Sequence, residues 1–327
     1  MKLGCFIIPY FGKFPDMFPV FLKTCGANHN FDWLFFTDVE DEYDYPDNVR
    51  VIKLSFDELK EKIQNKFDFT IVINEPHKLC DYKPAYGYIF EDYIAEYKFW
   101  GHCDIDTIMG DLDGLLTDDF LSNYDKVFCL GHMILYKNNY ENNRVFMSDY
   151  KGRSLYRESF SSCLTTVFDE TFRGKDNIHT LFVASEKSVF DEDWSANFLI
   201  RPSKFIRTKY VAKTDSFVSE DPNMVFLYVW DRGHIIRYWL DSGNLHKEEL
   251  LYMHFQLRNM AYDKKITEKD IFKIIPEKFE CLEMDVSRTT FKKIKKYHIT
   301  THYFFMKKHN LKEKMKKRKR LEEKNEH

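Results

Sequence analysis

Residues 99–106 read FWGHCDID, and this stretch decides the fold of the chain. The apolar run over residues 99–105 predicts a buried strand, with Asp106 at its carboxyl end. In open α/β sheets, ligands bind beyond the carboxyl ends of the strands. The stretch therefore predicts a sheet strand that delivers the carboxylates of Asp104 and Asp106 to a ligand site.

The chain before this stretch alternates buried strands with helices. Short apolar runs predict strands over residues 3–10, 31–38 and 49–54. Helices are predicted over residues 15–25 and 56–67, the second with lysines and glutamates between its apolar positions. The order strand, helix, strand, strand, helix favours an α/β fold with an open, mostly parallel sheet flanked by helices.

Further elements are expected on both sides of the Asp pair. Residues 81–87 lead into a helix that runs through Tyr97. Additional strands are predicted over residues 126–130, 188–190, 225–229 and 250–255.

Composition places the chain among ordinary globular proteins. Of its 327 residues, 44% are hydrophobic and 31% are charged, and its seven cysteines form no CxxC pair. It has no secretory leader and no apolar run of about 18 residues that could span a membrane. These features predict a cytoplasmic protein with reduced cysteines.

Charge is distributed unevenly along the chain. Residues 288–327 contain 15 Lys and Arg against 4 Asp and Glu, a net +11, which leaves −14 for residues 1–287 out of the total of −3. We therefore expect a catalytic domain over 1–287 and a basic, helical tail over 288–327. Lysines beside aromatic residues favour binding of the tail to an anionic membrane surface, here the inner face of the plasma membrane, or to a partner. The acidic body makes nucleic acid an unlikely partner.

The pair Asp104 and Asp106 has the chemistry of a metal site. Residues two apart on a strand point to the same side, so both carboxylates can reach one cation. Mg²⁺ and Mn²⁺ take oxygen ligands and share them with substrate phosphates. Asp-x-Asp alone is a common pattern, and a solvated turn is its alternative reading. No GxxxxGK[ST], GxGxxG or GxSxG motif is present, which disfavours P-loop enzymes, dinucleotide-dependent enzymes and α/β hydrolases.

In its motifs and their order, the chain resembles the GT-A nucleotide-sugar glycosyltransferases, in particular bacterial capsule and cell-surface polysaccharide transferases. The resemblance covers roughly residues 1–260 and implies a GT-A fold, Rossmann-like and mostly parallel. Asp104-Ile105-Asp106 is similar to the DxD motif, which implies Mn²⁺ or Mg²⁺ as cofactor. The donor-nucleotide positions implied by the resemblance are Pro9, Tyr10, Gly12, Asp38, Lys83 and Asp104.

Three later segments extend this resemblance. His254 resembles the C-terminal histidine that completes the metal shell with Asp104 and Asp106. The segment 192–194 (EDW) resembles the xED element, which implies Asp193 as the base of an inverting reaction. Gly131, His132 and Trp194 take acceptor-side positions, and His102 is expected to pack under the metal site.

The residues themselves leave other roles open. Asp193 could be a helix cap, Asp38 a strand-end cap, His254 a core histidine and Lys83 a solvated charge. The expected function is transfer of a hexose from a UDP-sugar to a glycan or lipid-linked saccharide. The alternatives are a nucleotidyltransferase, and a scaffold without catalytic activity that binds a membrane surface through its tail.

Overall fold

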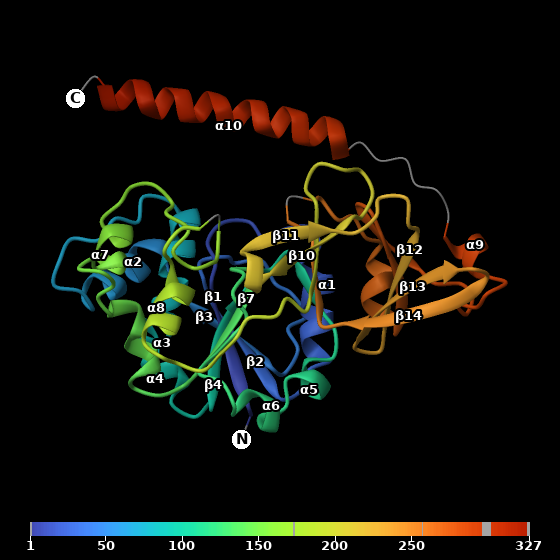
Figure 1. The fold of residues 1–327 in the computed structure, drawn as a ribbon, viewed down its shortest axis with the longest axis horizontal. Helices are drawn as coiled ribbons and strands as arrows, with labels where there is room; N and C mark the ends of the chain where they lie inside the picture. The colour runs from blue at the N-terminus through green and yellow to red at the C-terminus, as the bar shows by residue number, and fades with distance from the viewer. Residues whose placement is uncertain (1, 173, 257, 296–301, 326–327) are drawn as a thin grey trace.

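The computed structural model describes residues 2–172, 174–256, 258–295 and 302–325, and its strands form three sheets (Figure 1). The first sheet has the order β3-β2-β1-β4-β7-β6-β8. Its strands are β1 (Gly4–Pro9), β2 (Phe31–Thr37), β3 (Val49–Lys53), β4 (Phe99–Cys103), β6 (Lys126–Val127), β7 (Met133–Lys137) and β8 (Val189–Phe190).

This sheet is mixed and, as predicted, mostly parallel, since six of its seven described strands point the same way. Strands β3, β2, β1 and β4 are parallel neighbours, as predicted. Strand β7 then runs antiparallel to both β4 and β6. It was not predicted, and it lies inside the sheet between β4 and β6, with its direction opposite to that of the other described strands.

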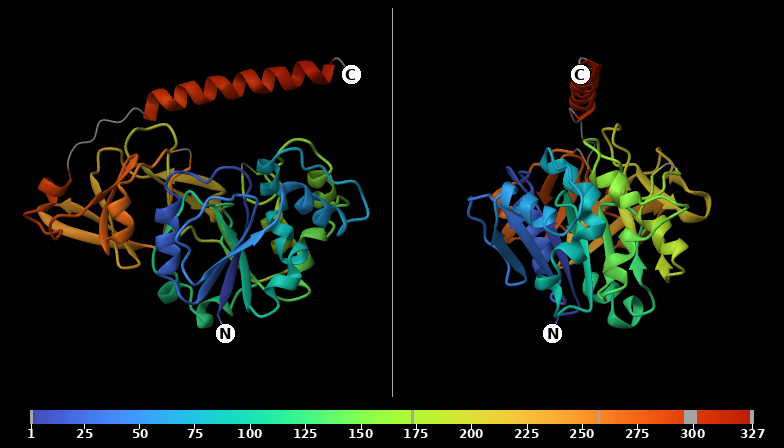
Figure 2. Two further views of the ribbon diagram at one scale, coloured as in Figure 1. Left: turned by 180° about the vertical axis from the view of Figure 1, so that it is seen from behind. Right: turned by 90° about the vertical axis from the view of Figure 1, so that its left-hand side faces the viewer.

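Helices cover both faces of the first sheet (Figures 1 and 2). One face packs on α2 (Phe56–Gln64), η1 (Pro76–Ala85), α3 (Tyr86–Ile89), α4 (Glu91–Ile94), η2 (Asn142–Met147), α7 (Leu155–Phe160) and α8 (Ile178–Ala184). The other packs on α1 (Phe18–Gly26), α5 (Leu112–Leu115) and α6 (Asp118–Leu121). Alternate strand residues supply the two cores, with Ile7 on one face and Phe6 on the other.

The single helix predicted to run through Tyr97 is instead broken into η1, α3 and α4. Pro84 lies inside η1, where it cannot donate a backbone hydrogen bond. Gly87 then lets the chain pack directly on β4, since a Cβ there would lie 2.2 Å from Cε2 of Trp100.

The second sheet brings the C-terminal half of the chain to the Asp pair. Its order is β11-β10-β9-β15-β5. The strands are β5 (Thr107–Met109), β9 (Ser195–Phe198), β10 (Arg207–Val211), β11 (Ser216–Ser219) and β15 (Tyr252–His254). In the β15–β5 pairing His254 is opposite Thr107, one residue after Asp106.

The third sheet is antiparallel, has the order β14-β13-β12-β16-β17, and was mostly unpredicted. Its strands are β12 (Phe226–Asp231), β13 (His234–Asp241), β14 (Asn244–Leu250), β16 (Ile271–Ile275) and β17 (Lys278–Cys281). The short helices η3 (Ala212–Thr214) and η4 (Lys264–Glu268) lie in the same half of the chain.

Two helices fall within the predicted tail. In α9 (Phe291–Ile294), Phe291 and Ile294 pack on Leu227 and Val229 of β12. Helix α10 (His302–Asn325) extends across the top of the molecule (Figures 1 and 2). Among the described residues, none of the helices combines the length and apolar character needed to cross a bilayer.

Candidate active site

The loop after β4 carries the Asp pair and is bonded to two other segments. The backbone N–H of Asp104 donates to the carbonyl of His132 at 3.1 Å. The carbonyl of Asp106 accepts from the N–H of Phe255 at 2.9 Å. The hydrogen bond between Asp106 and Phe255, together with the pairing of β15 with β5, holds His254 against the loop.

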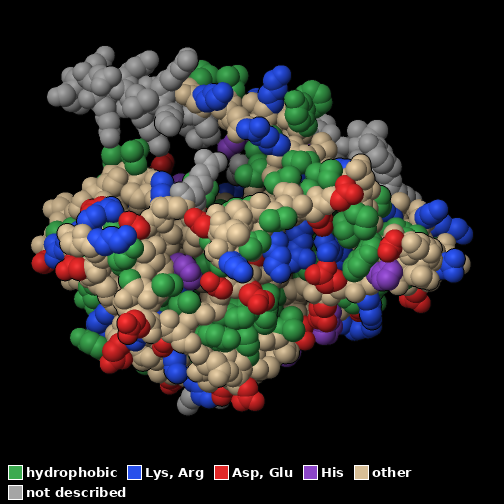
Figure 3. All heavy atoms as spheres, viewed as in Figure 1, with side chains coloured by type: hydrophobic (Ala, Val, Ile, Leu, Met, Phe, Trp, Pro, Cys, Tyr) green, Lys and Arg blue, Asp and Glu red, His purple; other side chains and the backbone are tan. Residues whose placement is uncertain are grey.

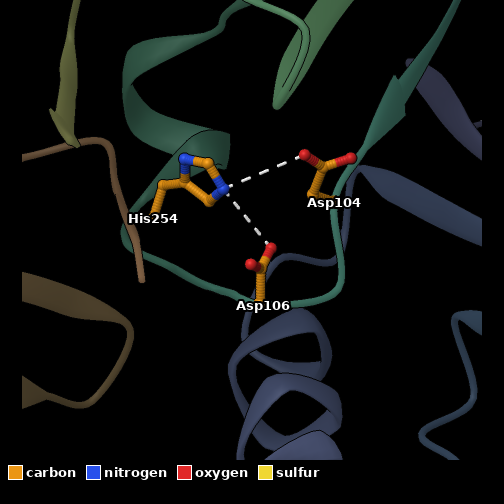
Figure 4. A group of neighbouring side chains, drawn as sticks. All are labelled: Asp104, Asp106 and His254. Carbon is orange, nitrogen blue, oxygen red and sulfur yellow. Dashed lines mark ion pairs between the residues drawn. The ribbon is translucent and has the colours of Figure 1, made fainter. Parts of the chain in front are cut away.

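Asp104, Asp106 and His254 converge on one point (Figure 4). The Nε2 atom of His254 lies 3.4 Å from Oδ1 of Asp106 and 3.9 Å from Oδ2 of Asp104. One ligand atom from each residue falls within 4.8 Å of the others. The structure thus brings together the three residues predicted to hold the metal.

A neighbouring amide orients the His254 ring. Nδ1 of His254 lies 3.2 Å from Oδ1 of Asn197 on β9, and the same oxygen accepts from Nε2 of Gln256. An amide oxygen only accepts, so Nδ1 is assigned the proton and the lone pair of Nε2 faces the carboxylates. Metal-binding histidines are oriented in this way.

Asp104, Asp106 and Gln256 line a cavity with a volume of 720 Å³. This volume lies within the range of small-molecule sites. Its walls include Pro9, Tyr10, Lys83 and Asp104, all predicted to bind the donor nucleotide, and Asp106, predicted as a metal ligand.

Lys83 joins the Asp pair to the neighbouring loops. Its Nζ lies 2.7 Å from Oδ1 of Asp104 and 2.9 Å from the carbonyl of Gly131. Burial would raise the pKa of Asp104, but Lys83 and then His254 outweigh it and hold that pKa at about 2. Asp104 is therefore ionised at neutral pH, as a metal ligand must be.

Two carboxylates that the sequence analysis missed, Asp169 and Glu170, lie on the other side of Lys83. Oδ2 of Asp169 is 3.5 Å from Nζ of Lys83, and Oε2 of Glu170 accepts from the N–H of Gly131 at 3.0 Å. A Cβ on Gly131 would lie 2.7 Å from Oδ2 of Asp169, so this approach requires glycine. Burial raises the pKa of Asp169 to about 8 and also raises the pKa of Glu170.

Asp81 anchors the segment that carries these carboxylates. It accepts hydrogen bonds from the backbone N–H groups of Thr166 and Phe168, and it forms a buried ion pair with Lys78 at 2.6 Å. Residues 81–84 (DYKP) thus connect two parts of the site. Asp81 holds the segment of Thr166 and Phe168, and Lys83 forms an ion pair with Asp104.

The other donor-side predictions lie at the loop after β1. The pKa of Tyr10 is raised by burial and by the nearby charge of Asp106. The N–H of Gly12 donates to Oδ1 of Asp38 at 3.4 Å. The structure thus places Gly12 beside Asp38, although neither lines the cavity.

His132 and His102 are buried near the metal-binding group. Nδ1 of His132 lies 2.7 Å from the hydroxyl of Tyr252, and its ring centroid is 4.4 Å from that of His254. Burial lowers the pKa of both His132 and His102, so both are neutral at pH 7. His102 borders the cavity near Asp104.

Asp193 and Trp194 lie outside the cavity. Oδ1 of Asp193 accepts from the N–H and hydroxyl of Ser195, and Oδ2 accepts from the N–H of Tyr210. Trp194 stacks on Phe120 with ring centroids 5.1 Å apart. Both environments are those of structural residues, and the predicted roles as base and acceptor contact stay predictions.

Arg258 is a further residue that the sequence analysis missed. It is buried at the cavity wall, and its Nη2 donates to the carbonyls of Leu199, Pro202 and Lys204. Its Nη1 is buried without a hydrogen-bond partner among the described residues. The position of Arg258 four residues after His254 was the sequence signal available for it.

Comparisons with known proteins give a family and a weak structural likeness. A model described as "Family of unknown function (DUF6625)" matches residues 6–283, so the chain belongs to that family. No curated protein sequence matches the chain. Among solved structures, galactosyltransferase LgtC with donor and acceptor sugar analogs, and an active-site mutant of LgtC, each match with 14% identity and a TM-score of 0.36. Each match covers 60% of this chain and 75% of that chain. Such a TM-score does not establish a common fold.

Proposed function

We propose that this member of the DUF6625 family is a divalent-metal-dependent glycosyltransferase. It would transfer a hexose from a UDP-sugar to a glycan or lipid-linked saccharide in cell-surface polysaccharide synthesis. The observation that carries the proposal is the convergence of Asp104, Asp106 and Nε2 of His254 beside a 720 Å³ cavity that both aspartates line. These three metal ligands and a cavity of this volume suit a nucleotide sugar bound with its metal ion.

The three side chains fit Mn²⁺ or Mg²⁺ in charge as well as geometry. Burial disfavours a charged imidazole, yet Asp106 and then Asp104 raise the pKa of His254. Positive charge is therefore favoured at the point where Asp104, Asp106 and His254 would hold the ion. When bound, the ion supplies charge that stabilises the diphosphate leaving group.

Arg258 and Lys83 would complete the binding of the diphosphate. Nη1 of Arg258, which has no partner among the described residues, can donate a hydrogen bond to a phosphate oxygen, while the hydrogen bonds of Nη2 hold the guanidinium in place. Lys83 lies on the cavity wall and orients Asp104 through the 2.7 Å ion pair.

Glu170 has the freer carboxylate of the two candidate bases, neither of which lines the cavity. Its Oε2 accepts from the N–H of Gly131, and within the described part of the chain Oε1 has no hydrogen-bond partner, whereas both oxygens of Asp193 accept bonds from β9 and β10. Burial raises the pKa of Glu170, as suits a carboxylate that accepts a proton near neutral pH. We propose that Glu170 deprotonates the acceptor hydroxyl if the reaction inverts the anomeric centre.

The basic tail would bring the enzyme to its acceptor. In α10 the exposed Tyr303 and Phe304 are followed by exposed Lys307 and Lys308, a combination that favours an anionic membrane surface (Figure 3). A location on the inner face of the plasma membrane follows as part of the proposal. Flotation of full-length and tail-deleted protein with anionic liposomes tests it, and equal flotation of the two would refute it.

A donor screen tests the central proposal. UDP-, GDP- and CMP-sugars are compared by thermal shift with and without MnCl₂, because a ligand that binds the folded state raises its stability. We expect a metal-dependent shift with UDP-sugars, followed by release of UDP on turnover. No metal-dependent shift with any of the donors would refute the proposal, and release of pyrophosphate would point to nucleotidyl transfer.

Two matched variants test the base. Glu170→Gln should lower kcat by about 100-fold or more if the reaction inverts. Asp193→Asn should affect mainly the free energy of unfolding. An unchanged kcat in Glu170→Gln would refute its role as base, and a selective loss of kcat in Asp193→Asn would assign that role to Asp193.

A further inference from the structure

The first turn of α10 is docked on the body of the protein beside the cavity. The side chains of His302 and Met306 are buried, and Phe305 is part of the cavity wall. Its neighbour Phe304 is 72% exposed and does not line the cavity. Both phenylalanines are exposed, but Phe305 is less so, at 47%, and it alone of the two lines the cavity.

His302 fixes this turn to a loop that also holds Arg258. Nε2 of His302 lies 2.5 Å from the carbonyl of Ile200, and its Nδ1 lies 3.6 Å from Oε1 of Glu277. The neighbouring carbonyls of Leu199 and Pro202 accept from Arg258. One short loop therefore connects the start of the tail helix with a charged residue of the cavity.

We infer that Phe305 is a donor-site residue, and that His302 and Met306 are the positioning residues that hold it there. This inference rests on the proposed function, because it assigns the cavity to a nucleotide donor. The basic helix then has two roles, since its first turn completes the cavity wall while Lys307, Lys308, Lys312 and Lys314 remain exposed.

Docking of the helix and binding of the donor must be thermodynamically coupled. A ligand that contacts Phe305 binds more tightly when α10 is docked, and by linkage it makes the docked helix more stable. If binding requires the docked helix and α10 is undocked part of the time, the apparent Kd for the donor equals the Kd of the docked form divided by the docked fraction. The apparent affinity for the donor therefore falls as the helix undocks. Whatever holds the basic part of α10 can therefore change donor affinity without entering the cavity.

Phe305→Ala and Phe304→Ala are a matched pair for the test. Titration of each full-length variant with UDP in the presence of MnCl₂ should give a Kd about tenfold weaker for Phe305→Ala and unchanged for Phe304→Ala. In turnover, the loss should be in KM with kcat little changed, because a wall contact binds substrate and transition state alike.

The positioning residues are tested in the same titration. His302→Ala should weaken UDP binding, and His302→Gln, which keeps a donor for the carbonyl of Ile200, should restore it. Hydrogen exchange of the backbone amides of residues 302–306 should slow when UDP and MnCl₂ are added to the wild type, and this change should be smaller in Met306→Ala. An exchange rate that UDP leaves unchanged would contradict the coupling.

The outcomes separate this inference from the proposed function. If the wild type does not bind UDP with MnCl₂, the proposed donor site is refuted and this inference with it. If the wild type binds UDP but Phe305→Ala binds it equally well, the proposed function stands and the inference about the tail is overturned.

Discussion

Two groups of one histidine and two carboxylates in this protein have the same ligand types and very different surroundings. The pocket cluster consists of Asp104, Asp106 and His254, and the surface cluster of Asp111, His234 and Glu249. In both, one ligand atom from each residue lies within 4.8 Å of the others. The side chain of His254 is 11% exposed, whereas that of His234 is 46% exposed.

The histidines also differ in what their nitrogens contact. Nδ1 of His254 is bonded to Asn197, outside its cluster, which turns Nε2 toward the carboxylates of Asp106 and Asp104 at 3.4 and 3.9 Å. Nδ1 of His234 is bonded at 2.7 Å to Glu249, a member of its own cluster, and Oδ1 of Asp111 caps the N–H of Gly114. The surface histidine is thus closed by a short bond inside its own cluster, whereas the pocket histidine is oriented from outside and its ion pairs with the two carboxylates are longer. Ligand types alone do not make a metal site; the fixed orientation of the histidine and the cavity do.

The largest expected effect separates the two clusters by activity. Asp106→Ala should lower sugar transfer by about 1000-fold and abolish metal-dependent UDP binding, because it removes a carboxylate from the charge that stabilises the leaving group. Asp111→Ala is the control and should keep full turnover. UDP release measures both, and circular dichroism checks that each variant is folded. Unchanged turnover in Asp106→Ala would refute the assigned site.

The second prediction compares the histidines in metal binding. His254→Ala should weaken Mn²⁺ binding by about 100-fold, since it removes a ligand held in place before the metal binds. His234→Ala should leave the Kd for Mn²⁺ unchanged. Isothermal titration with MnCl₂ measures both values. An equal loss in the two variants would mean that the clusters are equivalent, contrary to their geometry.

The third prediction concerns the residue that orients His254. Asn197→Ala removes the acceptor for Nδ1 and should weaken Mn²⁺ binding by about tenfold. Asn197→Asp keeps an acceptor oxygen at that position and should keep most of the affinity. If both variants bind Mn²⁺ as the wild type does, the ring is oriented by its packing rather than by this hydrogen bond.

The sequence predicted the part of the fold that consists of buried apolar runs. The strands β1, β2 and β3 are confirmed to within one residue at each end, and α2, which Ser55 caps, begins where predicted and ends three residues early. The third sheet was missed because its strands are not uniformly apolar. Strand β14 (Asn244–Leu250) is largely exposed, and its polar sequence carries no strand signal.

The candidate site was predictable in part for a related reason. Asp104 and Asp106 follow a buried strand, which any reading of the sequence can locate. Asp169 and Glu170 lie in a loop, and Asp81, nearly 90 positions earlier in the chain, holds that loop by backbone hydrogen bonds. Asn197 reaches His254 only because β9 pairs with β15. Such contacts depend on sheet register and loop paths, which no local pattern encodes.

The smallest expected effect concerns the surface cluster and its dependence on pH. The hydrogen bond to Glu249 raises the pKa of His234 above its ordinary value, with Asp111 adding to the shift. Because the pKa is raised in the folded state, protonated His234 stabilises the fold. This stabilisation is fully present below the unfolded-state pKa of about 6.5 and is lost as pH rises through the folded-state pKa. Because the pair is largely exposed, His234→Gln should lower the free energy of unfolding by only about 0.5 kcal/mol at pH 6 and by nothing measurable at pH 9.

Urea denaturation at the two pH values measures this difference. Glu249→Gln should lower the free energy of unfolding by the same amount as His234→Gln. The double variant should lose no more than either single variant, because the two residues form one pair. An equal loss at pH 6 and pH 9 would contradict the ion pair. Stabilisation of the wild type by Mn²⁺ that disappears in His234→Gln but persists in His254→Ala would show instead that the surface cluster binds metal. The distinction between the two clusters would then lie in their access to the cavity and no longer in their capacity to hold an ion.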